Sequence, residues 1–297
     1  MRVRRVLTAA GGFVLVGATV WLAVTTLWIW RNQERVVFQP PDVVPPDPTG
    51  ARRVEYLAPD GTRLYGYLVA PAAATESTIV VVAFHGNADQ AAWLVPWAQE
   101  LSRRTVATVV IPEYRGYGGI PGPPTYASAS SDASGAIKFA RTFRPRRIVL
   151  YGHSLGSAIA AEQAAAMRDQ PPAALALQSP FTSAREMALR MLVPVIPWLW
   201  ERISRVHYDT RALVQTLSVD VWVAHGTADL TIPVRMGRAV FAAARQRGRL
   251  LVVAGAGHND VPELGGEAYW KWLTDAVTGP PSAPIGELEQ QGRGRFP

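Results

Sequence analysis

Residues 151–156 read Tyr-Gly-His-Ser-Leu-Gly, and this short stretch decides the fold. An apolar, β-rich run over residues 147–151 leads into it, and an alanine-rich run over residues 157–167 follows. A Gly-x-Ser-x-Gly pattern between a strand and a helix is typical of a nucleophile elbow, a turn so tight that the serine backbone is strained. Glycines two residues before and after the serine remove the Cβ atoms that would collide there. We therefore predict that Ser154 presents a reactive hydroxyl at the carboxyl edge of a sheet; the alternative is an ordinary strand–helix turn.

Strand-like and helix-like segments alternate on both sides of this turn. Pro-Asp-Gly at 59–61, between β-rich runs at 53–57 and 62–69, predicts a hairpin. The runs that follow predict strands at 78–84, 105–111, 147–151, 174–178, 219–224 and 250–254, and helices at 91–103, 128–142, 157–167, 234–246 and 266–277. A hairpin followed by repeated β-α units predicts an α/β fold, with a mostly parallel sheet and helices on both faces.

A serine hydroxyl needs a base, and the base needs a residue that orients it. Of the five histidines, His258 lies on a glycine-rich loop after the last predicted strand, at the edge where Ser154 is expected. Asp229 follows the 219–224 strand and reaches the same edge, so it is the candidate acid. Asp220 begins that strand at the opposite edge, and Asp260 is a weaker alternative because it lies so close to His258.

An acyl-transfer site also needs amide donors for the developing oxyanion. The first is the Leu155 N–H, at the start of the helix that follows Ser154. The second is the Asn87 N–H, in the His-Gly-Asn-Ala loop at 85–88, where Gly86 allows the backbone to approach closely. A plain glycine-containing turn is the alternative for that loop.

Five motifs together carry a family resemblance: His-Gly-Asn-Ala at 85–88, Tyr-Arg-Gly-Tyr-Gly at 114–118, Gly-His-Ser-Leu-Gly at 152–156, His-Gly-Thr-Ala-Asp at 225–229 and Gly-His-Asn at 257–259. Over residues 52–277 the chain resembles α/β-hydrolases, and more narrowly the Bem46-like branch with the α/β-hydrolase domain-containing proteins 13 and 17, which is described by the serine aminopeptidase S33 domain. The resemblance implies Ser154 as nucleophile, Asp229 as acid, His258 as base, and oxyanion amides at Asn87 and Leu155. Gly-Ile-Pro-Gly-Pro-Pro at 119–124 departs from the family pattern, so the entrance to the site is expected to differ.

The N-terminal residues read as a membrane anchor. Three arginines within residues 1–5 precede Val6–Trp30, which contain no charged residue and are long enough to cross a bilayer as a helix. We predict an uncleaved anchor over residues 1–31 rather than a signal peptide. The arginines place the N-terminus in the cytoplasm, and hence the domain outside the inner membrane of a bacterium.

Composition shifts divide the rest of the chain. A Pro-rich stretch predicts a stiff linker over residues 32–50, followed by the α/β-hydrolase domain over 51–278 and a disordered tail over 279–297. Within the domain, residues 181–215 interrupt the alternation and predict a small helical cap insert. That insert is either a cap packed on the domain or a lid whose Trp198 and Trp200 line an acyl pocket or rest on the membrane.

Composition excludes several classes of function. The 297 residues include no cysteine, which rules out a thiol nucleophile, disulfides and cysteine zinc sites. The net charge of +7 is carried by dispersed arginines without a nucleic-acid recognition motif, so we expect no nucleic-acid partner. Two explanations of the charge are open: a basic surface that lies near anionic lipid, or a general bias toward arginine on solvated faces.

The sequence hypothesis is therefore a membrane-anchored serine hydrolase that cleaves carboxylic ester or thioester bonds of a small-molecule or lipid-like acyl substrate, without metal or cofactor. An acyltransferase or a peptidase would use the same residues. An inactive, anchored binding protein on the same fold is the alternative from another class.

Overall fold

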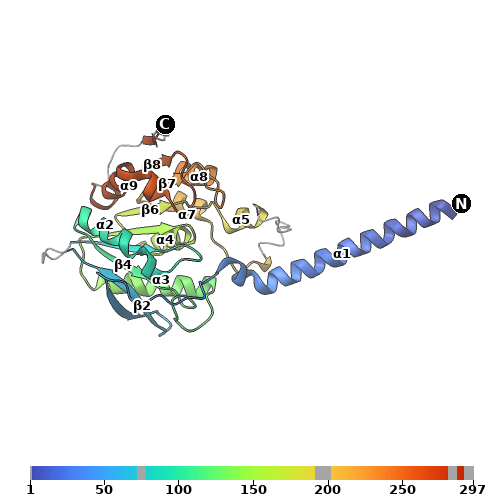
Figure 1. Ribbon diagram of the computed structural model, residues 1–297, viewed down its shortest axis with the longest axis horizontal. Coiled ribbons are helices and arrows are strands. Elements are labelled where there is room, and N and C mark those ends of the chain that lie inside the picture. The colour runs from blue at the N-terminus through green and yellow to red at the C-terminus, as the bar shows by residue number, and fades with distance from the viewer. Residues whose placement is uncertain (1, 72–77, 191–201, 280–285, 291–297) are drawn as a thin grey trace.

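The computed structural model describes residues 2–71, 78–190, 202–279 and 286–290, with the backbone alone for residues 2–15 and 286–290. Helix α1 (Arg2–Val37) projects away from the body of the molecule, which is built around one sheet (Figure 1). The predicted cap insert falls partly within this description, as α5 (Ala184–Arg190) and α7 (Thr210–Thr216). Trp198 and Trp200 lie outside the described residues.

The sheet follows the order β1-β2-β4-β3-β5-β6-β7-β8-β9 within the described part of the chain. Its strands are β1 (Arg52–Leu57), β2 (Arg63–Val69), β3 (Ile79–Phe84), β4 (Thr108–Pro112), β5 (Arg147–His153), β6 (Ala174–Gln178), β7 (Asp220–Gly226), β8 (Arg247–Val253) and β9 (Gly286–Gln290). The β1–β2 hairpin and the β2–β4 pair are antiparallel, and all other pairs are parallel. The central strands are continuous apolar runs because both of their faces are buried.

Helices cover both faces of the sheet, as predicted. The short helix η1 (Ala91–Leu94), α2 (Val95–Thr105) and α9 (Val261–Thr278) lie on one face, and α3 (Tyr126–Arg141), α4 (Leu155–Ala166), α7 and α8 (Val234–Ala243) on the other (Figure 1). Helix α9 begins five residues before its predicted start at Gly266, since it comprises two helical pieces that join across a kink there (φ +49°). This arrangement is the α/β-hydrolase fold.

The C-terminal residues correct one prediction. We expected a disordered tail over residues 279–297, but residues 286–290 form β9 and pair in parallel with β8. An exposed strand edge offers unpaired N–H and C=O groups, so even a polar segment can add to it through its backbone.

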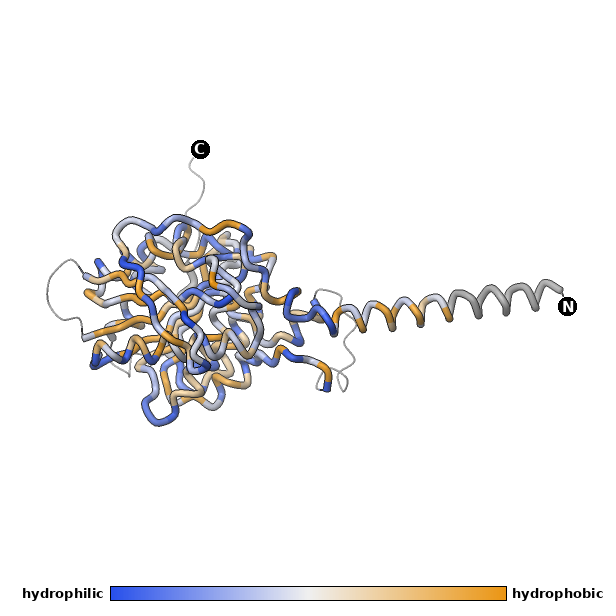
Figure 2. Tube along the Cα trace, turned by 90° about the horizontal axis from the view of Figure 1, so that it is seen from below, coloured by the Kyte–Doolittle hydropathy of each residue, from blue (hydrophilic) through white to orange (hydrophobic). Residues whose placement is uncertain are grey.

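Helix α1 gives no support for the predicted anchor. Among the described residues, no helix is both long enough and apolar enough to cross a membrane. In Figure 2, the coloured part of α1 carries many apolar residues, and hydrophilic residues lie where the helix meets the domain.

Residues 33–49, which we call the N-terminal strap, are not a free linker. Phe38 is buried in the core, and Gln33 bonds to the backbone of Ile203 and Arg205. Further along, Tyr67 donates to Asp47 (2.7 Å) and Gln99 donates to the carbonyl of Thr49 (2.9 Å). Residues 38–48 form neither helix nor strand, and contacts with the domain hold them in place.

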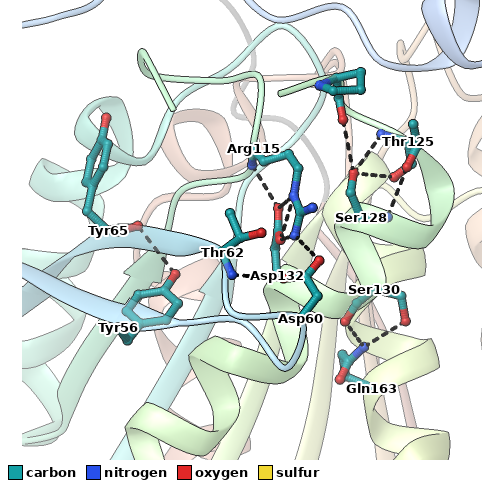
Figure 3. A network of polar contacts seen from close by, with 11 residues as sticks. Tyr56, Asp60, Thr62, Tyr65, Arg115, Thr125, Ser128, Ser130, Asp132 and Gln163 are labelled. Carbon is teal, nitrogen blue, oxygen red and sulfur yellow. Dashed lines mark hydrogen bonds and ion pairs between the residues drawn. The ribbon is translucent and has the colours of Figure 1, made fainter. Parts of the chain in front are cut away.

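The Tyr-Arg-Gly-Tyr-Gly turn after β4 is anchored by charge. Arg115 bonds Asp132 of α3 through its side chain (2.6 Å) and its backbone N–H (2.8 Å), and it also reaches Asp60 of the β1–β2 turn (2.8 Å; Figure 3). A capping box between Thr125 and Ser128 starts α3 in the same network. Arg115 therefore fixes the loop between β4 and α3 rather than facing the predicted site.

Candidate active site

Ser154 lies between β5 and α4 in the strained turn that its motif predicts. Its backbone has φ +53° and ψ −116°, a conformation costly for a residue with a side chain. A Cβ on Gly152 would lie 2.2 Å from the carbonyl oxygen of Gly156, and a Cβ on Gly156 would lie 2.2 Å from that of Phe84. Both glycines are therefore required for the helix to pass this close to the strands.

The structure brings Ser154, His258 and Asp229 together. His258 Nε2 lies 2.9 Å from Ser154 Oγ, and His258 Nδ1 lies 2.7 Å from Asp229 Oδ2. The three residues follow β5, β8 and β7, so the parallel sheet places them at one edge. Asp260, the weaker alternative, instead accepts the backbone N–H of Gly257 (2.6 Å) and so braces the loop that carries His258.

Asp229 is held as an anion. Its Oδ1 accepts the backbone N–H groups of Thr231 (2.9 Å) and Ile232 (2.7 Å), which leaves Oδ2 for His258. Burial alone would raise the pKa of this carboxyl, but hydrogen bonds from His225, His258 and Ile232 outweigh it and hold the pKa well below its usual range. A charged acceptor beside Nδ1 places the proton of a neutral His258 on that nitrogen and leaves Nε2 free to accept the proton of Ser154.

Two further histidines surround this arrangement, and sequence reasoning assigned neither a role. His225 Nε2 donates to the carbonyl of Ile232 (2.8 Å) and lies 3.3 Å from Asp229 Oδ2. His153 Nε2 donates to the carbonyl of His258 (3.2 Å), while burial and the neighbouring His258 lower its pKa to about 3. The signal for the contact of His225 with Asp229 was their spacing, because His225 stands near the end of β7 and Asp229 follows four residues later in the next loop.

The candidate oxyanion loop follows β3 and borders Ser154. A Cβ on Gly86 would come within 3.4 Å of the Cβ of Ser154, so the backbone of this loop lies directly against the nucleophile. Leu155 begins α4, and its N–H is one of the first helical amides, which have no partner within their own helix. Leu155 follows Ser154 directly and Asn87 lines the same pocket as Ser154, and the role of their two amides stays a prediction.

The side chain of Asn87 ties the oxyanion loop to the strap. Its Oδ1 accepts the backbone N–H of Gln39 and the hydroxyl of Tyr117, both at 2.8 Å, and its Nδ2 donates to the carbonyl of Val37 (2.7 Å). The bonds to Gln39 and Val37 hold the loop from outside the domain that the sequence delimited at residue 51, and the bond from Tyr117 holds it from within that domain.

A buried ion pair between His85 and Glu113 also supports the oxyanion loop. His85 Nε2 lies 2.8 Å from Glu113 Oε1, and His85 Nδ1 lies 2.9 Å from the carbonyl of Gly86. Burial would lower the pKa of His85, but the carboxylate of Glu113 outweighs it and raises that pKa. Glu113 Oε2 also accepts the backbone N–H of Ala91 (3.0 Å), so the pair connects both ends of the loop.

A pocket of about 740 Å³ opens beside Ser154 and His258. Aromatic side chains form much of its wall, with Asp89 and Glu263 among its polar residues; its lining also includes Trp93, Trp97, Tyr151, Trp270, Gln178 and Asn87. None of the described residues of the cap insert lines this pocket. Within the described part of the chain, no group of three or more acidic or histidine side chains is arranged to hold a metal ion.

An α/β-hydrolase fold with a hydrogen-bonded Ser–His–Asp set at the strand ends defines the class of serine hydrolases. Comparison with known proteins agrees with that class, because the family model described as "Alpha/beta hydrolase family" matches residues 79–224. The chain belongs to this family, in the branch of the α/β-hydrolase domain-containing proteins.

Two curated relatives illustrate the likeness. The chain is 33% identical to the uncharacterized protein Rv2307c of Mycobacterium tuberculosis, over 84% of this chain and 90% of that protein. It is 30% identical to human alpha/beta hydrolase domain-containing protein 17B, over 65% of this chain and 62% of that protein.

Two solved structures share the fold at low sequence identity. The Pyrococcus furiosus esterase Pf2001 is 17% identical with a TM-score of 0.64, covering 80% of this chain and 98% of that one. Esterase 2 of Thermogutta terrifontis is 22% identical with a TM-score of 0.60, covering 78% and 95%.

Proposed function

We propose that this protein is a serine hydrolase that cleaves carboxylic ester or thioester bonds through an acyl-enzyme. The observation that carries the proposal is the continuous hydrogen-bonded path from Ser154 through His258 to Asp229, on a strained elbow beside an open pocket. Esters and thioesters are the favoured substrates because their leaving groups need less protonation than an amine does.

The geometry supports the following sequence of steps. Ser154 Oγ attacks the acyl carbonyl while His258 Nε2 takes its proton, and Asp229 holds the imidazole and stabilises its positive charge. The N–H groups of Leu155 and Asn87 stabilise the oxyanion. His258 then protonates the leaving group, and finally activates a water molecule that releases the acid and frees Ser154.

Labelling with a fluorophosphonate tests this proposal, because such a probe reacts with a serine that a base has activated. We expect the full chain to be labelled and to hydrolyse p-nitrophenyl acetate, and Ser154→Ala to lose both properties while its thermal unfolding is preserved. Ser102→Ala is the matched control, since it removes a buried hydroxyl of α2 that has no hydrogen-bond partner among the described residues. A folded wild type that is neither labelled nor active would favour the binding-protein alternative.

We also propose that the N-terminal helix attaches the protein to a membrane, with the domain outside the cytoplasm. This second proposal rests on the uncharged run Val6–Trp30, and on the apolar side chains that α1 leaves exposed between Val16 and Trp30. In bacterial fractionation, the full chain should pellet with membranes and resist carbonate extraction, whereas a chain without residues 1–31 should not. Recovery of the full chain in the soluble fraction would contradict it.

A further inference from the structure

The pocket beside Ser154 contains a polar side chain that the proposed reaction does not use. Gln178 is the last residue of β6, pairs in register with His153, and is only 3% exposed. Its carbonyl accepts the backbone N–H of Ser154 (3.0 Å), so its side chain starts directly beside the nucleophile.

Two buried tyrosines fix the orientation of the Gln178 amide. The hydroxyls of Tyr151 and Tyr269 each lie 2.8 Å from Gln178 Oε1. Trp97 Nε1 lies 3.0 Å from the Tyr269 hydroxyl, and an indole N–H can only donate. The oxygen of Tyr269 therefore accepts from Trp97, and its own proton is available for Gln178.

The reversed amide would leave this network incomplete. If the amide nitrogen faced the tyrosines, it would donate to both oxygens, and the proton of Tyr269 could go only to Tyr151, 3.3 Å away. The proton of Tyr151 would then have no acceptor among the described residues, and an unpaired buried donor is costly. Gln178 Oε1 thus faces the tyrosines, and its Nε2, which no described residue accepts from, is left for the pocket that Gln178 lines.

We propose that Gln178 is a specificity-determining residue that binds an acceptor oxygen of the acyl group, close to the scissile carbonyl. The inference rests on the proposed esterase function and narrows its substrate class. The class is esters of aryl-substituted carboxylic acids that carry an ether, hydroxyl or keto oxygen on the carbon next to the ester carbonyl. The aromatic part packs against Trp93, Trp97 and Trp270, which line the same pocket.

A matched pair of esters tests this assignment on the full-length protein. The p-nitrophenyl esters of phenoxyacetic acid and 3-phenylpropanoic acid have the same length and differ by one oxygen in place of one CH₂ group. For each protein, the preference is kcat/KM for the phenoxyacetate divided by kcat/KM for the 3-phenylpropanoate. The measured quantity is the preference of the wild type divided by that of each variant. The higher intrinsic reactivity of the phenoxyacetate cancels in that quotient.

Two variants remove the N–H donors in different ways. Gln178→Met removes the whole amide, whereas Gln178→Glu keeps an acceptor for Tyr151 and Tyr269 and so preserves the buried network. We expect the preference for the oxygen-bearing ester to fall about tenfold in both. Gln163→Met, which replaces a buried glutamine of α4 outside the pocket, should leave the preference unchanged.

The outcomes separate this inference from the proposed function. An unchanged preference in both Gln178 variants overturns the assignment, as does a wild type that cleaves p-nitrophenyl acetate but neither aromatic ester. A higher preference in the variants would mean that the amide oxygen faces the pocket, and would overturn it too. A wild type without fluorophosphonate labelling at Ser154 would refute the proposed hydrolase itself.

Discussion

Replacement of Asp229 by asparagine tests the proposed base and acid together, because the structure fixes how the new side chain must lie. Asp229 Oδ1 accepts the backbone N–H groups of Thr231 (2.9 Å) and Ile232 (2.7 Å). An asparagine must keep its carbonyl oxygen toward these two donors, so its NH₂ group points at His258 Nδ1. The imidazole then has to accept at Nδ1 and carry its proton on Nε2.

That change of tautomer removes the base. With a proton on Nε2, His258 donates to Ser154 Oγ, 2.9 Å away, and cannot take the serine proton. Loss of the correct tautomer in a Ser–His–Asp set costs about 10⁴-fold in kcat, or about 5.5 kcal/mol of transition-state stabilisation. We expect a loss of this size for Asp229→Asn.

The assay is the steady-state hydrolysis of p-nitrophenyl acetate, with thermal unfolding measured on the same samples. Asp260→Asn is the matched control, since its amide oxygen can still accept the backbone N–H of Gly257, and we expect its kcat to change by less than about threefold. If folded Asp229→Asn keeps more than a tenth of the wild-type kcat, or if Asp260→Asn shows the large loss instead, the assignment of the acid is wrong.

Three other perturbations have outcomes that follow from single contacts. Gly237→Ala would place a Cβ 2.2 Å from His225 Nδ1. We therefore expect the free energy of unfolding in urea to fall by about 1–3 kcal/mol and kcat to fall as well, and unchanged values would refute the contact. Burial raises the pKa of Glu162 from 4.5 to about 7, so the folded state keeps a proton that the unfolded state has already lost between those values. Stability should therefore fall as pH rises through this window, by up to about 3 kcal/mol, and Glu162→Gln should flatten that slope in unfolding measurements at pH 4.5 and 8. Deletion of residues 1–50 should lower kcat at least about tenfold, because the side chain of Asn87 loses its bonds to the strap, whereas deletion of residues 1–31 should preserve activity.

The boundary at residue 51 shows where local sequence patterns misled. Prolines between residues 40 and 48 indicated a stiff, extended spacer, and these residues form neither helix nor strand. The strap nevertheless bonds to Asn87, Tyr67 and Gln99, which lie far away in the sequence. No local pattern encodes such partners, because they depend on which loops the fold brings alongside. The same holds for β9. Its polar composition gave no strand signal, and it forms by pairing with the open edge of β8.

The amino-acid sequence by itself determined the elbow, the order of strands and helices, and the candidates Ser154, Asp229 and His258. It could do so because strand–turn–helix patterns, glycine requirements and the common edge of parallel strands are local or topological properties. Only the tertiary structure decided which amide faces the pocket at Gln178, which histidine lies beside Asp229, and how the strap holds the oxyanion loop. Those features depend on distances between side chains on separate elements, and distances of a few ångströms are set by the packing of the whole domain.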